Sequence, residues 1–286
     1  MKRITVFGAT GMLGKPVTIE LLNAGYEVTA LVRNVEKASR ELPEGIHLVE
    51  GDLQNTNAIK EVLEGAEGVY ISIANTYKDK ENQFNAEHHG LDNILRVAKQ
   101  CNIKQVSLLS SFLARNYQGD WWIFKNKKSC IDRIKGSGVP YTIFYASSFM
   151  ENITSGMLRG NSVSTVKSEL NNKSFWISAR DFGKQVANAF NTDQALNNEY
   201  AAQGLKDFTM EEAAIEYAKH YSKAKLKVSF TPRWIMTTLS VFNPMIKFMA
   251  KMSEVNISTN ETFEAQKTWN ELGQPTTTIS LFAQNS

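Results

Sequence analysis

A turn built on three glycines, close to the start of the chain, constrains the fold more than any other feature. Residues 4–7 form an apolar run, residues 8–14 read Gly-Ala-Thr-Gly-Met-Leu-Gly, and residues 15–22 have a helical pattern. Glycines at positions 8, 11 and 14 suit a tight turn, a close approach of backbone N–H groups to a pyrophosphate, and close packing of helix on strand. The start of a helix also favours negative charge. The residues predicted to hold a dinucleotide pyrophosphate are Gly8, Thr10, Gly11, Met12 and Leu13.

Strand-like and helix-like segments alternate six times in the first 150 residues. Short connections between such segments predict an α/β fold, a doubly wound parallel sheet with strand order 3-2-1-4-5-6. After residue 150 the pattern changes, and residues 176–190 are expected to return as a segment that packs on the sheet. We therefore predict a dinucleotide-binding domain over residues 1–150 and a smaller, mostly helical substrate lobe over residues 151–286.

Several helices are predicted from apolar periodicity or from capping residues. They are expected over residues 82–100, 120–135 and 149–158, and a capping box at Thr209 to Glu212 opens another that ends near Tyr221. The tail carries a stripe of methionine and aromatic residues. Such a stripe favours a place in the core, with a pliable apolar substrate pocket as the alternative. Its members are Trp234, Met236, Phe242, Met245, Phe248, Met249 and Met252.

The residue that follows the second predicted strand bears on cofactor choice. In a dinucleotide fold a carboxylate at this position accepts the 2′-hydroxyl of NAD, whereas an arginine can pair with the 2′-phosphate of NADP. This chain has Arg33 there and no acid before Glu36. We predict NADP(H) in preference to NAD(H). The alternative is that Arg33 is an ordinary solvated side chain.

The ends of the remaining strands supply the other predicted cofactor contacts. Asp52 and Leu53 follow the third strand and could bind the adenine amino group and cover its ring. Asp52 and Asn55 also stand where a helix N-cap is expected, and the two interpretations are compatible. The fourth and fifth strands end where the crevice of such a sheet opens. The residues predicted to face the cofactor there are Ser72, Ile73, Ala74 and Ser110.

Composition and charge exclude several classes of function. The net charge of +3 comes without a basic block, so no nucleic-acid partner is expected. Cys101 and Cys130 lack metal-ligand spacing, and with no signal peptide visible they suit a reducing cytoplasm. His88 and His89 are expected to point in different directions along a helix, so no metal site is predicted. Residues 234–252 are too interrupted by polar residues for a membrane span.

The motifs above resemble the NmrA-like branch of the atypical short-chain dehydrogenase/reductases. The resemblance rests on the residue 8–14 turn, on Leu-Val-Arg-Asn at 31–34, on Gly-Asp-Leu at 51–53 and on Ser-Gly-Val-Pro-Tyr-Thr-Ile at 137–143, and it continues to Gly273. It implies a Rossmann domain that binds NAD(P). The branch includes quinone and dye reductases, isoflavone-reductase-like enzymes, and NADP-binding redox sensors without turnover.

The resemblance also implies a catalytic residue. The superfamily uses Tyr-x-x-x-Lys, and Lys127 falls at the lysine position, where it would hold the nicotinamide ribose, but Ile123 stands in place of the tyrosine. Tyr117 or Tyr145 is the alternative proton donor, and Tyr145 is also expected beside the cofactor. We expect an NADPH-dependent reductase of a small apolar, aromatic or quinone-like acceptor. A sensor that gates a protein partner is the second hypothesis, and a sugar-nucleotide epimerase is the weaker third.

Overall fold

The structure is a computed structural model that describes residues 2–115, 117–167, 171–257 and 261–286. Contacts within the chain group it into two compact units. The larger unit is made of three separate segments, residues 1–146, 182–201 and 267–274. The smaller unit takes the intervening segments, residues 147–181 and 202–266, together with residues 275–286.

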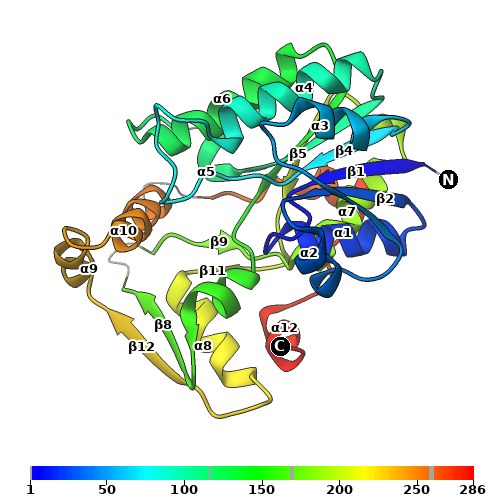
Figure 1. Cartoon of the computed structure of the whole chain (residues 1–286). Coiled ribbons are helices and arrows are strands. Elements are labelled where there is room, and N and C mark those ends of the chain that lie inside the picture. The colour runs from blue at the N-terminus through cyan, green and yellow to red at the C-terminus, as the bar shows by residue number, and fades with distance from the viewer. Residues whose placement is uncertain (1, 116, 168–170, 258–260) are drawn as a thin grey trace. The chain divides into compact units, whose positions relative to one another are not determined.

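The larger unit is built on a seven-stranded sheet in the order β10-β6-β5-β4-β1-β2-β3 (Figure 1). The predicted order 3-2-1-4-5-6 is therefore confirmed, and β10 adds a seventh strand beside β6. Neighbours from β3 to β6 pair in parallel, as in the register of Val6 with Ala30 of β2 and Tyr70 of β4. The strands are β1 (Arg3–Phe7), β2 (Glu27–Val32), β3 (Ile46–Glu50), β4 (Gly68–Ile71), β5 (Gln105–Ser111), β6 (Tyr141–Ala146) and β10 (Asn198–Ala202).

Helices cover both faces of this sheet. Figure 1 shows α3, α4 and α6 on one face, and α1, α2 and α7 on the other. Because both faces are covered, β4 is buried throughout and β1 is buried from Ile4 to Phe7. The helices are α1 (Gly14–Asn23), α2 (Val35–Glu41), α3 (Thr56–Leu63), α4 (Leu91–Gln100), α5 (Phe112–Arg115), α6 (Trp122–Gly136), α7 (Ala179–Ala189) and α11 (Gln266–Leu272), with the short turns η1 (Ala86–Gly90) and η3 (Asp193–Ala195).

One predicted helix starts later than its sequence suggests. The pattern predicts a helix from residue 82, but the first helical residue is Ala86, because the Asn85 side chain caps it by accepting the His88 N–H at 3.0 Å. The first turn, η1, is π-helical, with the Gly90 N–H bonded to the Asn85 carbonyl at 3.2 Å. It widens the helix just before α4 and brings one extra residue into the turn.

The smaller unit combines helices with two short sheets, β12-β8-β7 and β11-β9. The capping box at Thr209 and Glu212 opens α8 as predicted. Only a short helical stretch with the π-helical turn η2 forms within the helix predicted over residues 149–158. The elements are η2 (Ile153–Met157), α8 (Met210–His220), α9 (Arg233–Leu239), α10 (Pro244–Ile257) and α12 (Ile279–Gln284), with β7 (Leu158–Arg159), β8 (Ser162–Val166), β9 (Ser174–Phe175), β11 (Asp207–Phe208) and β12 (Lys227–Thr231).

The interpretation of the methionine and aromatic stripe as core is wrong for much of its length. Trp234 is 69% exposed and Phe242 is 83% exposed, and no residue of α9 is buried. The reason is that side chains of η2, β8, α8 and α12, with Trp176 and Leu226, already fill the apolar cluster of this unit, leaving no buried face for α9 to cover. Among the described helices, none has the length and apolar character needed to cross a bilayer.

Candidate functional site

The predicted cofactor residues follow the strands of one sheet edge. Six neighbouring parallel strands end at the same edge, so the segments that follow them lie in the spatial order of β3, β2, β1, β4, β5 and β6. Asp52 thus comes at one end of the row, and Tyr145, within β6, at the other. Arg33, the residue 8–14 turn, Ser72 and Ser110 lie between them in that order. The carboxyl ends of an open parallel sheet are where ligands of such folds bind.

The glycine turn after β1 has no room for side chains at two of its positions. A Cβ on Gly8 would lie 2.1 Å from the Ser72 carbonyl oxygen, and Gly8 has φ of +90°. A Cβ on Gly14 would lie 1.9 Å from the Gly8 carbonyl oxygen, so Gly14 brings the first turn of α1 directly onto the strand end. Thr10, Gly11 and Met12 are exposed on the outside of this turn. The arrangement leaves backbone at the N-terminus of α1 open to an anion.

Arg33 and Asp52 differ in how many hydrogen bonds and ion pairs their side chains make with described residues. Arg33 is exposed and makes no ion pair with any residue that the structure describes, while the nearest acid, Glu36, pairs with Arg40. Asp52 accepts N–H bonds from Gln54 at 2.8 Å and Asn55 at 3.1 Å, both on the same oxygen. The α3 N-cap is Asn55 rather than Asp52. Asp52 therefore shapes the turn before the helix and keeps its second oxygen for another donor.

Two buried polar groups near the ends of β4 and β5 have no hydrogen-bond partner among the described residues. They are the Ser110 hydroxyl, on a side chain 4% exposed, and the side-chain nitrogen Nδ2 of Asn75, whose backbone N–H is bonded. Ser110 lines a small cavity of about 10 Å³ together with Ile73 and Lys127, enough for about one water molecule. A buried polar group without a partner is costly in a native fold, and a bound ligand or water is the usual remedy. The sheet edge thus offers unused hydrogen-bonding capacity where a cofactor is predicted.

Lys127 forms a buried ion pair that its sequence position did not predict. Its ammonium group contacts the Glu87 carboxylate, with side chains 21% and 3% exposed. Burial opposes the charge on Lys127, but the adjacent carboxylate more than offsets this, and the pKa of Lys127 is raised. The other Glu87 oxygen accepts the Asn75 N–H at 3.2 Å. Lys127 is thus held as a cation beside the cavity that Ser110 lines.

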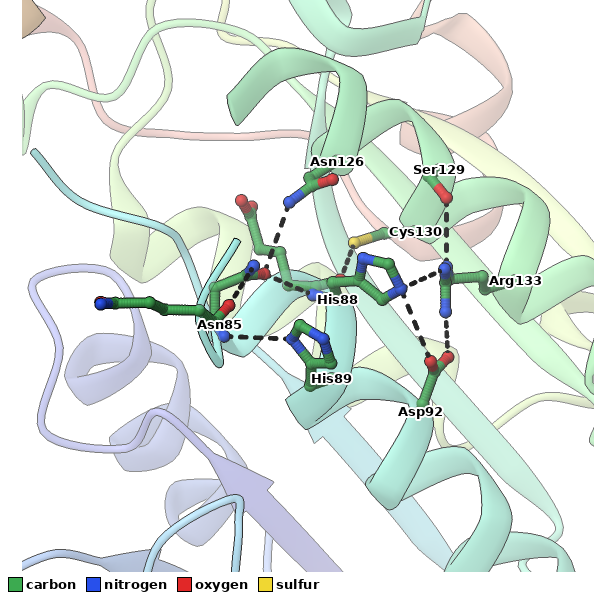
Figure 2. Close-up of polar contacts among 10 residues, drawn as sticks. Asn85, His88, His89, Asp92, Asn126, Ser129, Cys130 and Arg133 are labelled. Atoms are coloured by element: carbon green, nitrogen blue, oxygen red, sulfur yellow. Dashed lines mark hydrogen bonds and ion pairs between the residues drawn. The ribbon is translucent and has the colours of Figure 1, made fainter. Parts of the chain in front are cut away.

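The π-helical turn places Glu87 against α6. From α6, the Cys130 thiol donates to the Glu87 carbonyl oxygen at 2.8 Å, and Asn126 donates to the Asn85 side chain at 3.4 Å (Figure 2). Burial, together with the nearby Glu87 carboxylate, raises the pKa of the Cys130 thiol to about 12. Cys130 is therefore a hydrogen-bonding group here and not a nucleophile. These contacts fix η1 and α6 relative to one another.

The position of the missing tyrosine is apolar and closed. Ile123 lies one turn before Lys127 on α6 and is 4% exposed. The two tyrosines considered as substitutes are engaged elsewhere. The Tyr117 hydroxyl accepts the Trp121 N–H at 3.0 Å, and the Tyr145 hydroxyl donates to Glu199 at 2.5 Å. Burial, reinforced by Glu199, raises the pKa of Tyr145. Neither hydroxyl is held beside Lys127 as the superfamily tyrosine would be.

The expectation that His88 and His89 point in different directions is wrong. Their rings stack with centroids 4.5 Å apart and planes 11° from parallel. The π-helical turn rotates successive residues less than an α-helix does, and both rings are anchored: Arg133 bonds His88 Nε2 at 2.7 Å, and the Asn85 N–H bonds His89 Nδ1 at 3.3 Å (Figure 2). Burial and the Arg133 charge lower the pKa of His88, so the neutral ring accepts from Arg133.

Glu87 and Asn75 are the site residues that the sequence reasoning missed. Glu87 precedes Leu91 by four residues and Ile94 by seven, so it falls on the apolar stripe of the helix rather than on its polar face. A carboxylate at such a position needs a buried partner. The sequence therefore indicates that the Glu87 carboxylate needs a partner, but it does not indicate which cation pairs with it.

Solved structures share this fold over nearly the whole chain. An NADPH-dependent quinone oxidoreductase from Escherichia coli is 21% identical, with a TM-score of 0.76 and coverage of 98% of each chain. A triphenylmethane reductase from Citrobacter sp. is 16% identical, with a TM-score of 0.74 and coverage of 98% of each chain. A nucleoside-diphosphate-sugar epimerase from Staphylococcus aureus is 17% identical, with a TM-score of 0.76, 99% coverage of this chain and 100% of the other.

Curated relatives include several proteins named photosystem II assembly factor Ycf39. The one from Guillardia theta is 23% identical over 292 residues, which cover 97% of this chain and 91% of that protein. The one from Cyanidium caldarium is 32% identical over 155 residues, 53% of this chain and 48% of that protein. The chain spans about half the length of the first curated relatives it matches. The model of the NmrA-like family matches residues 1–282, and the chain belongs to that family.

Proposed function

We propose that this protein binds NADP(H) along the carboxyl edge of its sheet and reduces a small apolar, aromatic or quinone-like acceptor. The observation that carries the proposal is the glycine turn after β1, which excludes side chains at Gly8 and Gly14 and leaves residues 10–12 exposed at the start of α1. Such a turn accepts a pyrophosphate on backbone N–H groups. The Ser110 hydroxyl and the Asn75 Nδ2, which have no hydrogen-bond partner among the described residues, support the same cofactor position further along the edge.

The preference for NADP(H) rests on Arg33. Its exposed guanidinium, which pairs with no acid in the described part of the chain, can take the 2′-phosphate through charge-assisted bonds. In the variant Arg33→Ala we expect the dissociation constant for NADPH to rise about 10- to 100-fold, since such bonds contribute roughly 1.5–3 kcal/mol each, and that for NADH to stay within about twofold. Calorimetric titration of both cofactors measures this. Arg40→Ala is the matched control, because Arg40 is an exposed arginine of α2 that already pairs with Glu36; equal losses in both variants would contradict a specific role for Arg33.

The reaction assigned to the site requires little acid catalysis from the protein. NADPH, when bound, supplies the hydride. Lys127, held as a cation by Glu87, would position the nicotinamide ribose by hydrogen bonds, and the apolar side chain of Ile73 lines the same small cavity. A quinone-like acceptor gains its protons from water once reduced, so the absence of tyrosine at position 123 is compatible with turnover.

A sensor without turnover is the second candidate, and two observations favour it. Ile123 removes the proton donor, and Glu87 engages the lysine that the superfamily uses in catalysis. The relatives named assembly factor also suit a role in which the bound cofactor modulates contacts with a protein partner. A sensor of redox state needs different affinities for the two cofactor forms rather than a proton donor.

One set of measurements on the full chain distinguishes the two. NADPH consumption is followed with a panel of quinones and triphenylmethane dyes, for the wild type and for Lys127→Met, alongside calorimetry with NADP⁺ and NADPH. Turnover that falls at least about tenfold in Lys127→Met supports the reductase. Absence of turnover with a large difference between the two affinities supports the sensor. Absence of binding to either cofactor form contradicts both.

A further inference from the structure

Exposed apolar side chains gather on one part of the smaller unit, the α9–α10 segment, which we define as residues 230–252. Half of the large apolar side chains exposed in the described part of the chain belong to it. They are Phe230, Trp234, Leu239, Val241, Phe242, Met245 and Met249. Contiguous exposed apolar surface of this kind marks an interaction site.

The most exposed of these side chains sit at the turn between the two helices. Val241 is 78% exposed and Phe242 is 83% exposed, and both lie in the turn of residues 240–242 that joins α9 to α10. Met245 and Met249 follow in α10 four residues apart, so these two share one face of that helix just after the turn. Figure 1 shows α9 and α10 as neighbouring helices. The segment therefore presents an apolar tip followed by two methionines on one helix face rather than scattered residues.

The charged side chains within this segment, Arg233, Lys247 and Lys251, are all positive. Between Glu216 and Glu254 the sequence has no aspartate or glutamate, although the net charge of the whole chain is only +3. Its cations are Lys219, Lys223, Lys225, Lys227, Arg233, Lys247 and Lys251. All seven are exposed, and within the described ranges only Lys251 has an acidic partner, Glu254 at 3.3 Å. This surface is complementary to an anionic partner.

The combination of exposed apolar side chains and cations indicates the kind of partner. Lysine is depleted in protein–protein interfaces, and a phosphate backbone offers nothing to Val241 and Phe242. An anionic bilayer surface meets both requirements, because aromatic and aliphatic tips enter the headgroup region while lysines contact acidic headgroups. The 14 residues of α10 extend about 21 Å, less than the roughly 30 Å of a hydrocarbon core. We propose that the α9–α10 segment docks the protein on the surface of anionic membranes.

The test is flotation of the full-length protein with vesicles of phosphatidylcholine, alone or with about one third phosphatidylglycerol. We expect binding to the anionic vesicles, weak binding to the neutral ones, and a decrease as NaCl rises, because screening weakens the attraction. The double variant Trp234→Ala with Phe242→Ser should lower the partition coefficient at least about tenfold. Arg233→Gln and Lys247→Gln should each lower it about fivefold on anionic vesicles.

The control variants replace other exposed apolar side chains elsewhere in the same unit. Ile215 on α8 is 50% exposed and Leu281 on α12 is 43% exposed, and Ile215→Ser and Leu281→Ser should bind as the wild type does. Failure of the wild type to float with anionic vesicles would overturn the proposal, as would unchanged binding of the Trp234 and Phe242 double variant. If light scattering shows a wild-type dimer that this double variant breaks, and vesicles do not bind, the surface is an interface between two copies instead.

Discussion

Replacing Gly14 by alanine is expected to destabilise the larger unit by about 2–4 kcal/mol and to weaken NADPH binding at least about tenfold. A Cβ at this position would lie 1.9 Å from the Gly8 carbonyl oxygen, and that oxygen accepts the Gly11 N–H at 3.0 Å. Both groups in the clash are backbone, so no rotamer change relieves it. The N-terminus of α1 has to move away from β1, and the turn that would hold the pyrophosphate is distorted with it.

Urea unfolding followed by circular dichroism, and calorimetry with NADPH, measure the two effects. Gly136→Ala is the matched control, because Gly136 is exposed at the end of α6, has no atom within 4 Å of an added Cβ, and has an ordinary φ. That variant should stay within about 0.5 kcal/mol of the wild type or gain slightly. Equal stability and affinity in the two variants would show that α1 does not need its close approach to the strand.

Removing the charge of Glu87 is expected to cost about 3–5 kcal/mol of stability, because Glu87→Gln leaves the Lys127 ammonium buried without its counter-ion. The reverse variant, Lys127→Met, leaves the carboxylate of a side chain only 3% exposed without its cation and should cost a comparable amount. The double variant replaces both charges at once. It should therefore be more stable than the sum of the single losses predicts, by about 2–3 kcal/mol in a double-mutant cycle.

Two further measurements test the electrostatic origin of this effect. The pKa of Lys127, followed by carbon chemical shift, should fall in Glu87→Gln, because burial then opposes the charge with no carboxylate to offset it. Lys125 of α6 and Asp120, which precedes the helix, form an exposed pair at 2.9 Å, and Asp120→Asn should leave the unfolding transition unchanged. Additive losses in the cycle, or an unchanged pKa for Lys127, would refute the coupling of the two groups.

The sheet could be predicted from sequence because its signals are local. A few consecutive residues are enough to indicate an apolar strand, a glycine turn or a helix. The right-handed connection of parallel strands then places their carboxyl ends at the same edge of the sheet. The family match agrees with what the residue 8–14 turn and the Gly-Asp-Leu segment at 51–53 implied. The identity of the cofactor and the identity of the acceptor remain predictions.

The parts that escaped prediction depend on distant partners. Glu87 and Lys127 are 40 residues apart, and their pairing depends on the π-helical turn, which no residue pattern in 82–100 indicated. The burial of the methionine and aromatic stripe also depends on distant elements, so its own residues could not predict it. Its composition is typical of a core. Whether the stripe is buried depends on how much apolar surface the other elements supply, and in this unit those elements form the apolar cluster without α9.

The three-segment make-up of the larger unit bears on how this protein can be dissected. A chain shortened to residues 1–146 would lose α7, α11 and β10, and with them the carbonyl groups of Ala187 and Ala189 that receive Tyr26 at 2.8 Å and Gln105 at 3.1 Å. It would also expose the edge of β6 that pairs with β10, and an exposed strand edge can pair with strands of other molecules. Truncation after residue 146 should therefore yield aggregated material, and point substitution in the intact polypeptide is the way to separate the roles of the two units.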